Sequence, residues 1–438
     1  MTDGDALYQA ILDAPDDDAP RLVWADWLDE NGQPDRAEFV RLQCEFAKLD
    51  PGDLRLDELT EQYGRLTVNR EAWTAGLGPY ARNCGFWRGL PDWFELTTGR
   101  LAAALKELRR QVPAQCLSLT LSGGGHPELG NWAGLDAIRC LDVTEADADP
   151  FYPESSLRGW VWLIHSARLR GLGSFRADMV ESSVGFISAL RGTDWPDLRD
   201  LGLRIHHVPL REPPTTPWQA PPSPPWQDLA EAPWFSNLRS LDLRDCRLGD
   251  AGLDRLLTAS PPLALTRLNL GANDLTAAGV RRLASSRALA RVRRLALGQN
   301  NIGTAVADLL RSAALPELCS LDVSYCAGYG WQSGPDMLRA IAPAAPPGQL
   351  RALEANVCHC SAGSVARLVG SAVVSRLEVL SLNSNDLPDE AAAAIAESPH
   401  LGTLRRLELA NNRITDAGLR FLMRSRHLGA LRVLNLGG

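Results

Sequence analysis

The sequence predicts an α/β fold: a right-handed, horseshoe-shaped solenoid with a parallel inner sheet and outer helices, preceded by a small all-helical N-terminal domain. Two observations carry this prediction. A pattern of leucines recurs every 27 residues or so through the second half of the chain, and a constant period of this length indicates stacked repeats. The first fifty residues lack that pattern and hold thirteen acidic against four basic side chains. We therefore expect a helical domain at 1–50, a helical bridge at 51–85 and the solenoid at 86–438.

The first fifty residues predict three short helices. Pro20 and Pro34 suit the first turn of a helix, and Gly32 suits a helix end. The expected helices lie at 5–15, 19–32 and 34–49. In the last of them, apolar residues at helical spacing predict one buried stripe, made of Phe39, Leu42, Phe46 and Leu49.

Two tryptophans, Trp24 and Trp27, lie three residues apart and therefore on one face of the second expected helix. We expect them to anchor the helices to one another or to the first repeats. The alternative is an aromatic patch that faces a partner and is surrounded by Asp26, Asp29 and Glu30. Two pairs of opposite charge are expected to be ion pairs of the scaffold: Asp26 with Arg41, and Glu38 with Arg36.

From residue 238 onward the pattern Leu-x-x-Leu-x-Leu-x-x-(Asn/Cys)-x-Leu recurs, as in LRSLDLRDCRL and LTRLNLGANDL. The repeats begin at Leu238, Leu265, Val292, Leu318, Leu350, Leu377, Leu404 and Leu431. In each repeat the Leu-x-Leu alternation predicts a strand with buried leucines, and the remainder predicts a helix. Weaker copies begin at Cys116, Ile138, Leu169 and Leu198, and they extend the array back to a first strand near 90–98 and a helix at 99–111.

An Asn or Cys follows each strand, and we expect its side chain to turn inward and hydrogen-bond backbone groups where the strand ends. These positions are Asn273, Asn300, Asn385, Asn412, Cys246, Cys326 and Cys358. Helix signals follow at regular distances. Thr276 and Thr415 are expected to cap helix N-termini, and Asp250, Asp389 and Asp416 to lie in first turns.

These repeats resemble the ribonuclease-inhibitor-like leucine-rich repeats, over about 200 residues. The segment DDDAPRLVWADWLDENGQPDRAEFVRLQCEFAKL at 16–49 closely resembles the repeat-companion domain that precedes leucine-rich repeats in bacterial proteins, abundant in planctomycetes and myxobacteria. The match runs through Arg21, Leu22, Ala25, Asp26, Trp27, Leu28, Arg36, Ala37, Glu38, Phe39, Arg41 and Gln43. The stretch at 70–97 looks like that family's bridge into the first repeat. The resemblance brings no established biochemical activity.

Two insertions interrupt the repeats. Residues 208–234 are rich in proline and are expected to form an extended surface loop without a helix. The alternative is a docking segment of prolines and tryptophans for a partner. A second insertion, at 326–337, lengthens the repeat that begins at Leu318.

Charge and composition exclude several classes of function. The whole chain carries a formal charge of −8 and residues 1–50 carry −9, so the remainder sums to +1. Neither part offers the basic face of a nucleic-acid binder. No secretory signal and no apolar run long enough to cross a membrane is present, so we expect a soluble, cytoplasmic protein. Nine scattered cysteines without framework spacing are expected to be reduced and mostly buried.

The sequence motifs that could indicate a metal site, a phosphate site or a catalytic site are weak. Cys358–Cys360 reads Cys-His-Cys, but Cys358 occupies the inward structural position, and residues so close on one turn rarely converge on an ion. The glycine run in 122–126 lacks the Lys-Ser/Thr of a phosphate loop, and the pair at 206–207 lies at the end of an expected strand. We therefore expect no enzymatic activity, no metal and no cofactor.

The residues between and after the strand leucines are expected on the concave surface, where their mixed charges suit a folded protein partner. The candidate partner-binding residues are Asp242, Arg244, Arg267, Asn269, Arg294, Asp322, Glu354, Asn356, Asn383, Arg406 and Glu408. We therefore expect a non-enzymatic protein–protein interaction module. The alternatives are an ordinary solvated sheet face, a regulator of an enzyme such as a GTPase by analogy of fold, and a structural scaffold whose acidic domain caps the array.

Overall fold

The computed structural model describes residues 2–49, 55–81, 83–97, 101–121, 130–132, 134–145, 161–180, 184–206, 225–257, 263–326, 337–344 and 349–437. The chain divides into two compact units. The first contains Met1–Asp178 with Asp194–Asp197, and the second contains Met179–Thr193 with Leu198–Gly438. The domain boundaries expected near residues 50 and 85 stay predictions.

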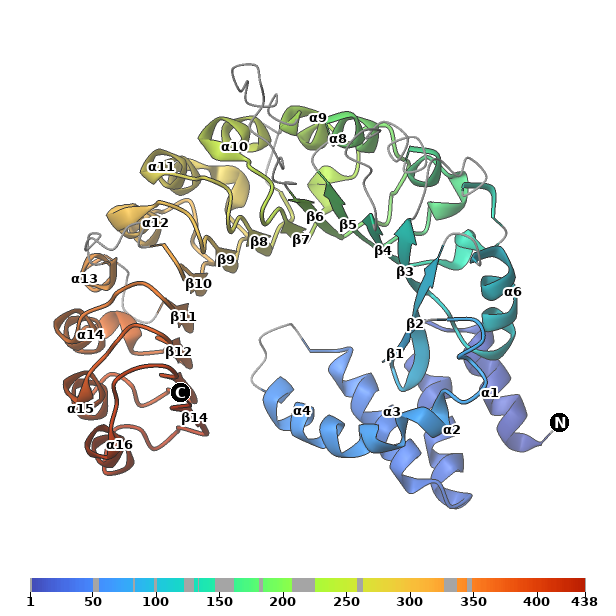
Figure 1. The fold of residues 1–438 in the computed structure, drawn as a ribbon, viewed down its shortest axis with the longest axis horizontal. Coiled ribbons are helices and arrows are strands. Elements are labelled where there is room, and N and C mark those ends of the chain that lie inside the picture. The colour runs from blue at the N-terminus through green and yellow to red at the C-terminus, as the bar shows by residue number, and fades with distance from the viewer. Residues whose placement is uncertain are drawn as a thin grey trace, which may run out of the picture. The chain divides into compact units, whose positions relative to one another are not determined.

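The first unit begins with helices and continues into strands (Figure 1). Its helices are α1 (Asp3–Asp13), α2 (Asp18–Glu30), α3 (Pro34–Phe46), α4 (Arg55–Leu66), α5 (Arg70–Trp73) and α6 (Leu101–Gln111). Its strands are β1 (Asn83–Trp87), β2 (Leu90–Thr97), β3 (Cys116–Leu121), β4 (Cys140–Glu145) and β5 (Ser174–Val180), the last of which runs two residues past the end of the unit. The three helices expected before the strands are confirmed as α1–α3.

Local signals explain where these helices begin. Thr2 and Asp5 form a capping box at α1, in which each side chain bonds the backbone N–H of the other residue. Asp17 caps α2 by accepting a hydrogen bond from the Ala19 N–H at 2.9 Å. Pro34 occupies the start of α3, where a missing N–H costs nothing.

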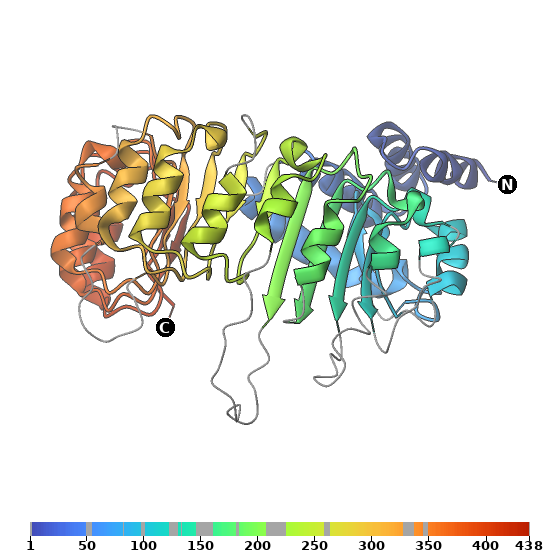
Figure 2. The same ribbon diagram turned by 90° about the horizontal axis from the view of Figure 1, so that it is seen from above.

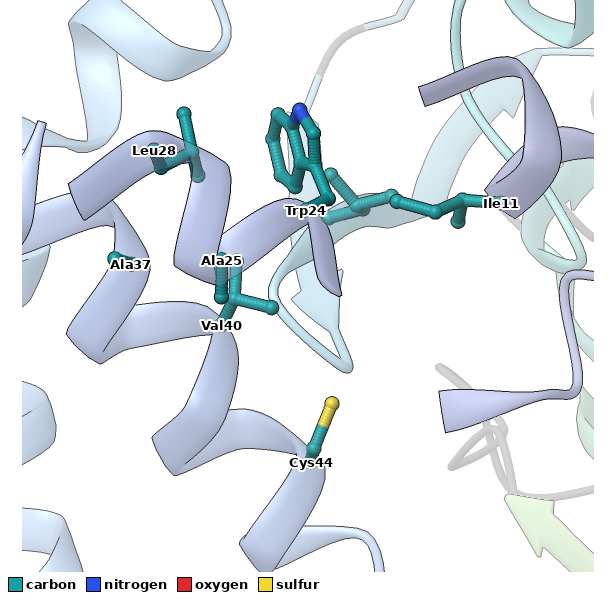
Figure 3. Packing of buried hydrophobic residues seen from close by; sticks show 8 residues of the cluster. Ile11, Trp24, Ala25, Leu28, Ala37, Val40 and Cys44 are labelled. Carbon is teal, nitrogen blue, oxygen red and sulfur yellow. The ribbon is translucent and has the colours of Figure 1, made fainter. Parts of the chain in front are cut away.

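Helices α1–α3 share one hydrophobic core with strand β2 (Figure 3). Its buried members are Ile11, Trp24, Ala25, Leu28, Ala37, Val40, Cys44 and Leu90. Trp24 is only 5% exposed and packs edge-on against Tyr8, with ring centroids 5.2 Å apart. Trp27 is partly buried and lies where a side chain at Gly4 would collide with its ring. The expectation that the tryptophans anchor the helices is confirmed.

The opposite side of α3 packs against α4. Phe39 and Leu42 are buried together with Leu59 and Leu66, while Phe46 and Leu49 of the same stripe are only partly covered. Arg41 pairs with both Asp26 and Asp29 at 2.7 Å, as expected of a scaffold ion pair. Arg36, expected to pair with Glu38, places its guanidinium over the Trp24 ring, 5.0 Å from the centroid.

A β-hairpin that the sequence did not predict joins the helices to the sheet. Strand β1 runs antiparallel to β2, so the strand expected to be first is second. The connecting Arg88 and Gly89 both have positive φ. A Cβ atom on Gly89 would lie 2.5 Å from the Val40 Cα, so the hairpin requires glycine to approach α3 this closely.

Two charged residues, Asp92 on strand β2 of this hairpin and Arg21 on α2, are fully buried. Arg21 donates to the Asp17 carbonyl at 2.9 Å, and Asp92 accepts from the Gln115 N–H. Burial raises the pKa of Asp92 to about 6, although this hydrogen bond and the charge of Arg21 act in the opposite direction.

Strands β2–β5 pair in parallel, and the expected helix at 99–111 is confirmed as α6. Strand β5 starts later than the repeat copy at Leu169 predicted. Leu169 lies in a short 3₁₀ turn, and Phe175 pairs with Leu141 and is fully buried. The buried phenylalanine, rather than a leucine, therefore sets the register of this repeat.

The second unit alternates short strands with helices. Its strands are β6 (Asp200–His206), β7 (Ser240–Asp242), β8 (Arg267–Asn269), β9 (Arg294–Ala296), β10 (Ser320–Asp322), β11 (Ala352–Glu354), β12 (Val379–Ser381), β13 (Arg406–Glu408) and β14 (Val433–Asn435). Its helices are α8 (Val184–Leu190), α9 (Trp226–Ala230), α10 (Gly249–Leu257), α11 (Ala277–Ser285), α12 (Val306–Arg311), α13 (Met337–Ile341), α14 (Ala362–Val369), α15 (Asp389–Glu397) and α16 (Asp416–Met423).

Within this unit the strands β6–β14 pair in parallel and in chain order. The strands line the inner side of a curve and the helices lie on its outer side (Figures 1 and 2). The predicted α/β solenoid, preceded by helices, is therefore confirmed. The curvature follows from the packing, because a helix is wider than a strand and each repeat holds one of each.

The inward asparagines hydrogen-bond backbone groups where the strands end, as expected, and these bonds link each repeat to the one before it. Asn385 Oδ1 accepts from the backbone N–H groups of Cys358 and Cys360 at 2.9 and 3.2 Å, and its Nδ2 donates to the Ala355 carbonyl at 2.8 Å. Asn273, Asn300 and Asn412 repeat this arrangement. A cysteine in the same position donates its thiol to the equivalent carbonyl, as Cys358 does to Val323 at 3.2 Å.

A second link joins the helices of neighbouring repeats. Thr415 caps α16, as predicted, and its N–H and hydroxyl both donate to the Asp389 carboxylate at 2.7 and 2.6 Å. The Gly418 N–H donates to the same carboxylate at 3.0 Å. These bonds hold the pKa of Asp389 below its usual range. Thr276 and Asp250 form the equivalent contact between α11 and α10, five repeats earlier.

The proline-rich insertion was expected to be a loop without a helix along its whole length, and this is wrong for its last residues. Residues 226–230 form α9, and Trp226 and Trp234 are buried. The Trp234 indole donates to the Thr193 hydroxyl at 2.8 Å. These two tryptophans therefore belong to the core, because their apolar rings close the widened repeat. Residues 207–224, and residues 327–336 of the second insertion, lie outside the described part of the chain.

Candidate functional site on the inner sheet face

The eleven predicted partner-binding residues occupy one face of the second unit. In strands β7–β13 the middle leucine of each strand is buried in the core, and the residues on either side of it face the opposite way. The register aligns them in two rows across the strands. The first row reads Asp200, Ser240, Arg267, Arg294, Ser320, Ala352, Val379, Arg406 and Val433, and the second reads Gly202, Asp242, Asn269, Ala296, Asp322, Glu354, Ser381, Glu408 and Asn435.

A third row follows directly after the strands. Backbone hydrogen bonds continue past the last strand residue, from Leu243 N–H to the Asn269 carbonyl and from Asp245 N–H to the Gly271 carbonyl. The same pattern recurs along the array and keeps Arg244, Asn356 and Asn383 on the inner face. The sequence pattern alone therefore placed all eleven residues on one face.

Arginines concentrate on strands β7–β9. Arg267 reaches past Ser240 to the Asp200 carboxylate, with 3.0 Å between Nη2 and Oδ1. Arg244 donates to the Gln299 amide oxygen at 3.2 Å. Arg294 lies directly beside Arg267 in the same row. Asp242 contributes the only negative charge among the predicted residues of these strands. Its Oδ1 accepts a hydrogen bond from the backbone N–H of Arg244 at 3.0 Å.

Carboxylates concentrate on strands β10–β13. Asp322 and Glu354 are direct neighbours in the second row, and Glu408 lies two strands further on. Desolvation raises the pKa of Glu354, and the negative charges of Asp322 and Glu408 raise it further. These carboxylates therefore repel one another in the absence of a positive group. The inner face is basic on β7–β9 and acidic on β10–β13, with Arg406 as the basic exception.

Two predicted residues are engaged in contacts within the sheet. Asn356 Oδ1 accepts from the Ser381 hydroxyl at 2.7 Å and the Asn383 N–H at 2.8 Å, and its Nδ2 donates to the Ser324 hydroxyl at 3.2 Å. Asn383 Oδ1 accepts from the Ala410 N–H at 2.7 Å. Both amides therefore hold the sheet together as well as lining its face.

The structure adds residues that the prediction left out. Asp200 and Arg204 on β6 lie on the same face, and the repeat copy at Leu198 already marked this strand in the sequence. Tyr325 is 54% exposed just after β10. Its φ is 60°, and the residue before the inward Asn or Cys has a positive φ in the other repeats as well, as at Asp245 and Gln299.

The weaker motifs gain no support as sites of chemistry. Cys358 faces inward, as predicted, and its thiol donates to a backbone carbonyl while His359 is exposed beside it. Within the described residues, no group of three or more His, Cys, Asp or Glu side chains could hold a metal ion. Residues 122–126 and His207 lie outside the described part. No described helix combines the length and the apolar character that crossing a membrane requires.

Comparisons with known proteins address the repeats. The family model described as Leucine Rich repeat matches residues 236–257 and 400–423, which contain β7 with α10 and β13 with α16. No curated protein matches the chain in sequence. Among solved structures, the chain is similar to the yeast Rad7 and Elc1 complex, with 13% identity, a TM-score of 0.40, and coverage of 88% of this chain and 98% of that one.

Two further solved structures are similar to the chain. The mouse RP105/MD-1 complex has 17% identity, a TM-score of 0.34, and coverage of 73% of this chain and 42% of that one. A leucine-rich-repeat protein of Leptospira interrogans has 15% identity, a TM-score of 0.30, and coverage of 79% and 90%. At these identities and TM-scores, the similarity to the three solved structures carries no conclusion about function. The two matched segments, with the repeating strands and helices around them, show that the chain contains leucine-rich repeats.

Proposed function

We propose that the protein is a non-enzymatic interaction module that binds a folded protein partner on the inner face of strands β7–β13. One observation carries the proposal: side chains of opposite sign are held in register on two adjoining parts of a single sheet face. The basic part is formed by Arg244, Arg267 and Arg294, and the acidic part by Asp322, Glu354 and Glu408.

The charge pattern favours a partner that carries the reverse order of charges. Like-charged carboxylates at Asp322, Glu354 and Glu408 gain stability when a cationic surface approaches, because their mutual repulsion is then relieved. Complementary potentials of this kind raise association rates and discriminate between partners. The polar, sign-mixed character argues against a lipid, which would select an apolar surface, and against nucleic acid, which would select a uniformly basic one.

The proposal places the protein in the cytoplasm. Nine cysteines without framework spacing favour a reducing compartment. All nine are thiols in the structure, and five of them, including Cys246 and Cys326, are buried.

The test compares the full-length protein with two matched variants in affinity capture from native lysate. The inner-face variant carries Asp322→Asn, Glu354→Gln and Glu408→Gln, which remove three charges and keep hydrogen-bonding groups of the same size. The control variant carries Asp254→Asn, Glu390→Gln and Glu397→Gln, three exposed residues of the outer helices. Circular dichroism checks that each variant folds.

We expect one protein to be recovered by the wild type and the control variant and lost by the inner-face variant. Its binding should weaken as salt rises, since the contact is between exposed charges. Recovery of the same protein by both variants, with unchanged affinity, would show that the inner face does not bind it.

A further inference from the structure

Two cysteines of the first unit stand side by side on its sheet. Cys116 on β3 pairs directly with Cys140 on β4, in a row that also holds Trp93 and Ser174. Both cysteines are partly exposed, and they alternate with the buried Leu117 and Leu141, so their side chains leave the sheet on the face opposite the core. Paired residues on neighbouring strands lie about 4.8 Å apart, which falls within the roughly 4.4–6.8 Å between Cα atoms that a disulfide spans.

The two sulfur atoms are already in contact. The Cys116 thiol donates a hydrogen bond to the Cys140 sulfur, and this bond together with burial raises the pKa of Cys116. Because the raised pKa of Cys116 disfavours its thiolate, we assign the first nucleophilic attack to Cys140.

The inward cysteines Cys326 and Cys358 of the second unit differ from this pair. Cys326 and Cys358 occupy the same position in neighbouring repeats, but each thiol donates to a backbone carbonyl, that of Leu297 at 3.2 Å and that of Val323 at 3.2 Å. Both are buried, and burial raises the pKa of Cys326 to about 12 and that of Cys358 to about 11. They provide an internal control for the exposed pair.

We propose that Cys116 and Cys140 form a site of reversible oxidative modification, at which a small disulfide such as oxidised glutathione converts the two thiols into one intramolecular disulfide. Cys140 loses its proton to solvent, and its thiolate attacks one sulfur of glutathione disulfide, which forms a mixed disulfide and releases one glutathione thiolate. Cys116 gives its proton to that glutathione thiolate. The resulting Cys116 thiolate attacks the Cys140 sulfur and expels the second glutathione as a thiolate, which takes up a proton from solvent. Two protein thiols and one glutathione disulfide thus yield one protein disulfide and two reduced glutathiones.

The cross-link would act on neighbouring side chains of the same face. Burial raises the pKa of Asp142, while the charge of the nearby Arg176 and a hydrogen bond from the Trp93 side chain act in the opposite direction. Trp93 is on β2 and Asp142 on β4, so this contact spans β3 beside Cys116. A disulfide between β3 and β4 therefore couples this polar cluster to the oxidation state of the surroundings. Such disulfides in a reducing compartment are typically transient and regulatory.

The experiment uses the reduced full-length protein under native conditions, exposed to a glutathione buffer rich in the disulfide. Remaining thiols are alkylated, the protein is digested without reductant, and the peptides are identified by mass spectrometry. We expect the 116–140 cross-link in most molecules, with Cys326 and Cys358 recovered as alkylated thiols, and loss of the cross-link on addition of dithiothreitol. In a Cys116→Ser variant we expect glutathione to remain on Cys140.

Two results would overturn the proposal. Glutathione that stays on Cys140 of the wild-type protein without a cross-link would show that the Cys116 sulfur cannot reach it. A cross-link between Cys326 and Cys358 formed at the same rate would show that partial exposure does not select the Cys116–Cys140 pair for oxidation. Circular dichroism of the oxidised wild-type protein checks that it remains folded.

Discussion

Replacing Asn385 by alanine tests whether the inward asparagines hold the repeats together. The change removes hydrogen bonds to the backbone N–H groups of Cys358 and Cys360 and to the Ala355 carbonyl, all within the turn after β11. Asn385 is 3% exposed, so water has little access to these groups in the native protein. A buried backbone group that loses its partner costs about 1–3 kcal/mol. Three such losses predict a decrease of about 4 kcal/mol in the free energy of unfolding.

The control is Asn385→Cys, because the chain itself uses cysteine at this position in other repeats. At Cys358 the thiol donates to the Val323 carbonyl, and the sulfur accepts bonds from the backbone of Cys326 and Tyr325. The cysteine variant should therefore lose about 2 kcal/mol, since bonds to sulfur are retained but are weaker.

Thermal unfolding followed by circular dichroism measures the difference. For a unit of this size about 1 kcal/mol shifts the midpoint by 2–4 °C, so the alanine variant should melt about 10 °C below the wild type. Amide hydrogen exchange at Cys358 should accelerate in the same variant, since its N–H loses its acceptor. A midpoint within 2 °C or so of the wild type would show that the side-chain bonds of Asn385 do not stabilise the array.

Two more predictions concern Asp92 on β2, near the start of the array, and Gly418 on α16, near its end. Burial raises the pKa of Asp92 to about 6, against 3.8 for an unburied aspartate. The folded state therefore binds the proton more tightly, and this group's contribution to stability is greatest below pH 4 or so and falls by about 3 kcal/mol as pH rises to about 6. Urea unfolding should accordingly show Asp92→Asn gaining about that amount relative to the wild type between pH 4 and pH 7, and a constant difference would contradict this assignment. In the repeat that begins at Leu404, a Cβ added at Gly418 would lie 2.4 Å from a carboxylate oxygen of Asp389. Gly418→Ala should lower the melting temperature by several degrees, whereas Gly402→Ala, whose Cβ meets nothing within 4 Å, should leave it nearly unchanged, and equal midpoints for the two variants would refute the steric argument.

The sequence by itself determined the repeat architecture and the direction of its side chains. A leucine alternation with a period of two fixes which residues enter the core. The sequence therefore predicts that the Leu241 side chain is buried and that the Asp242 side chain points away from the core, onto the inner face of the sheet. The inward asparagines were equally predictable, since a backbone turn without ladder partners needs a side chain to satisfy it. Local chemistry of this kind does not depend on distant parts of the chain.

Tertiary structure decided the features that depend on residues far apart in the chain. The hairpin at Asn83–Trp87 exists because Gly89 can approach Val40 of α3, a contact between positions 49 residues apart. Trp226 and Trp234 are buried although proline-rich sequence precedes them, and the Trp234 indole donates to the hydroxyl of Thr193, 41 residues earlier in the chain. The separation of basic and acidic side chains on the inner face, and the contact between Cys116 and Cys140, likewise arise only when strands pair in register, since neighbours in the sheet come from different repeats.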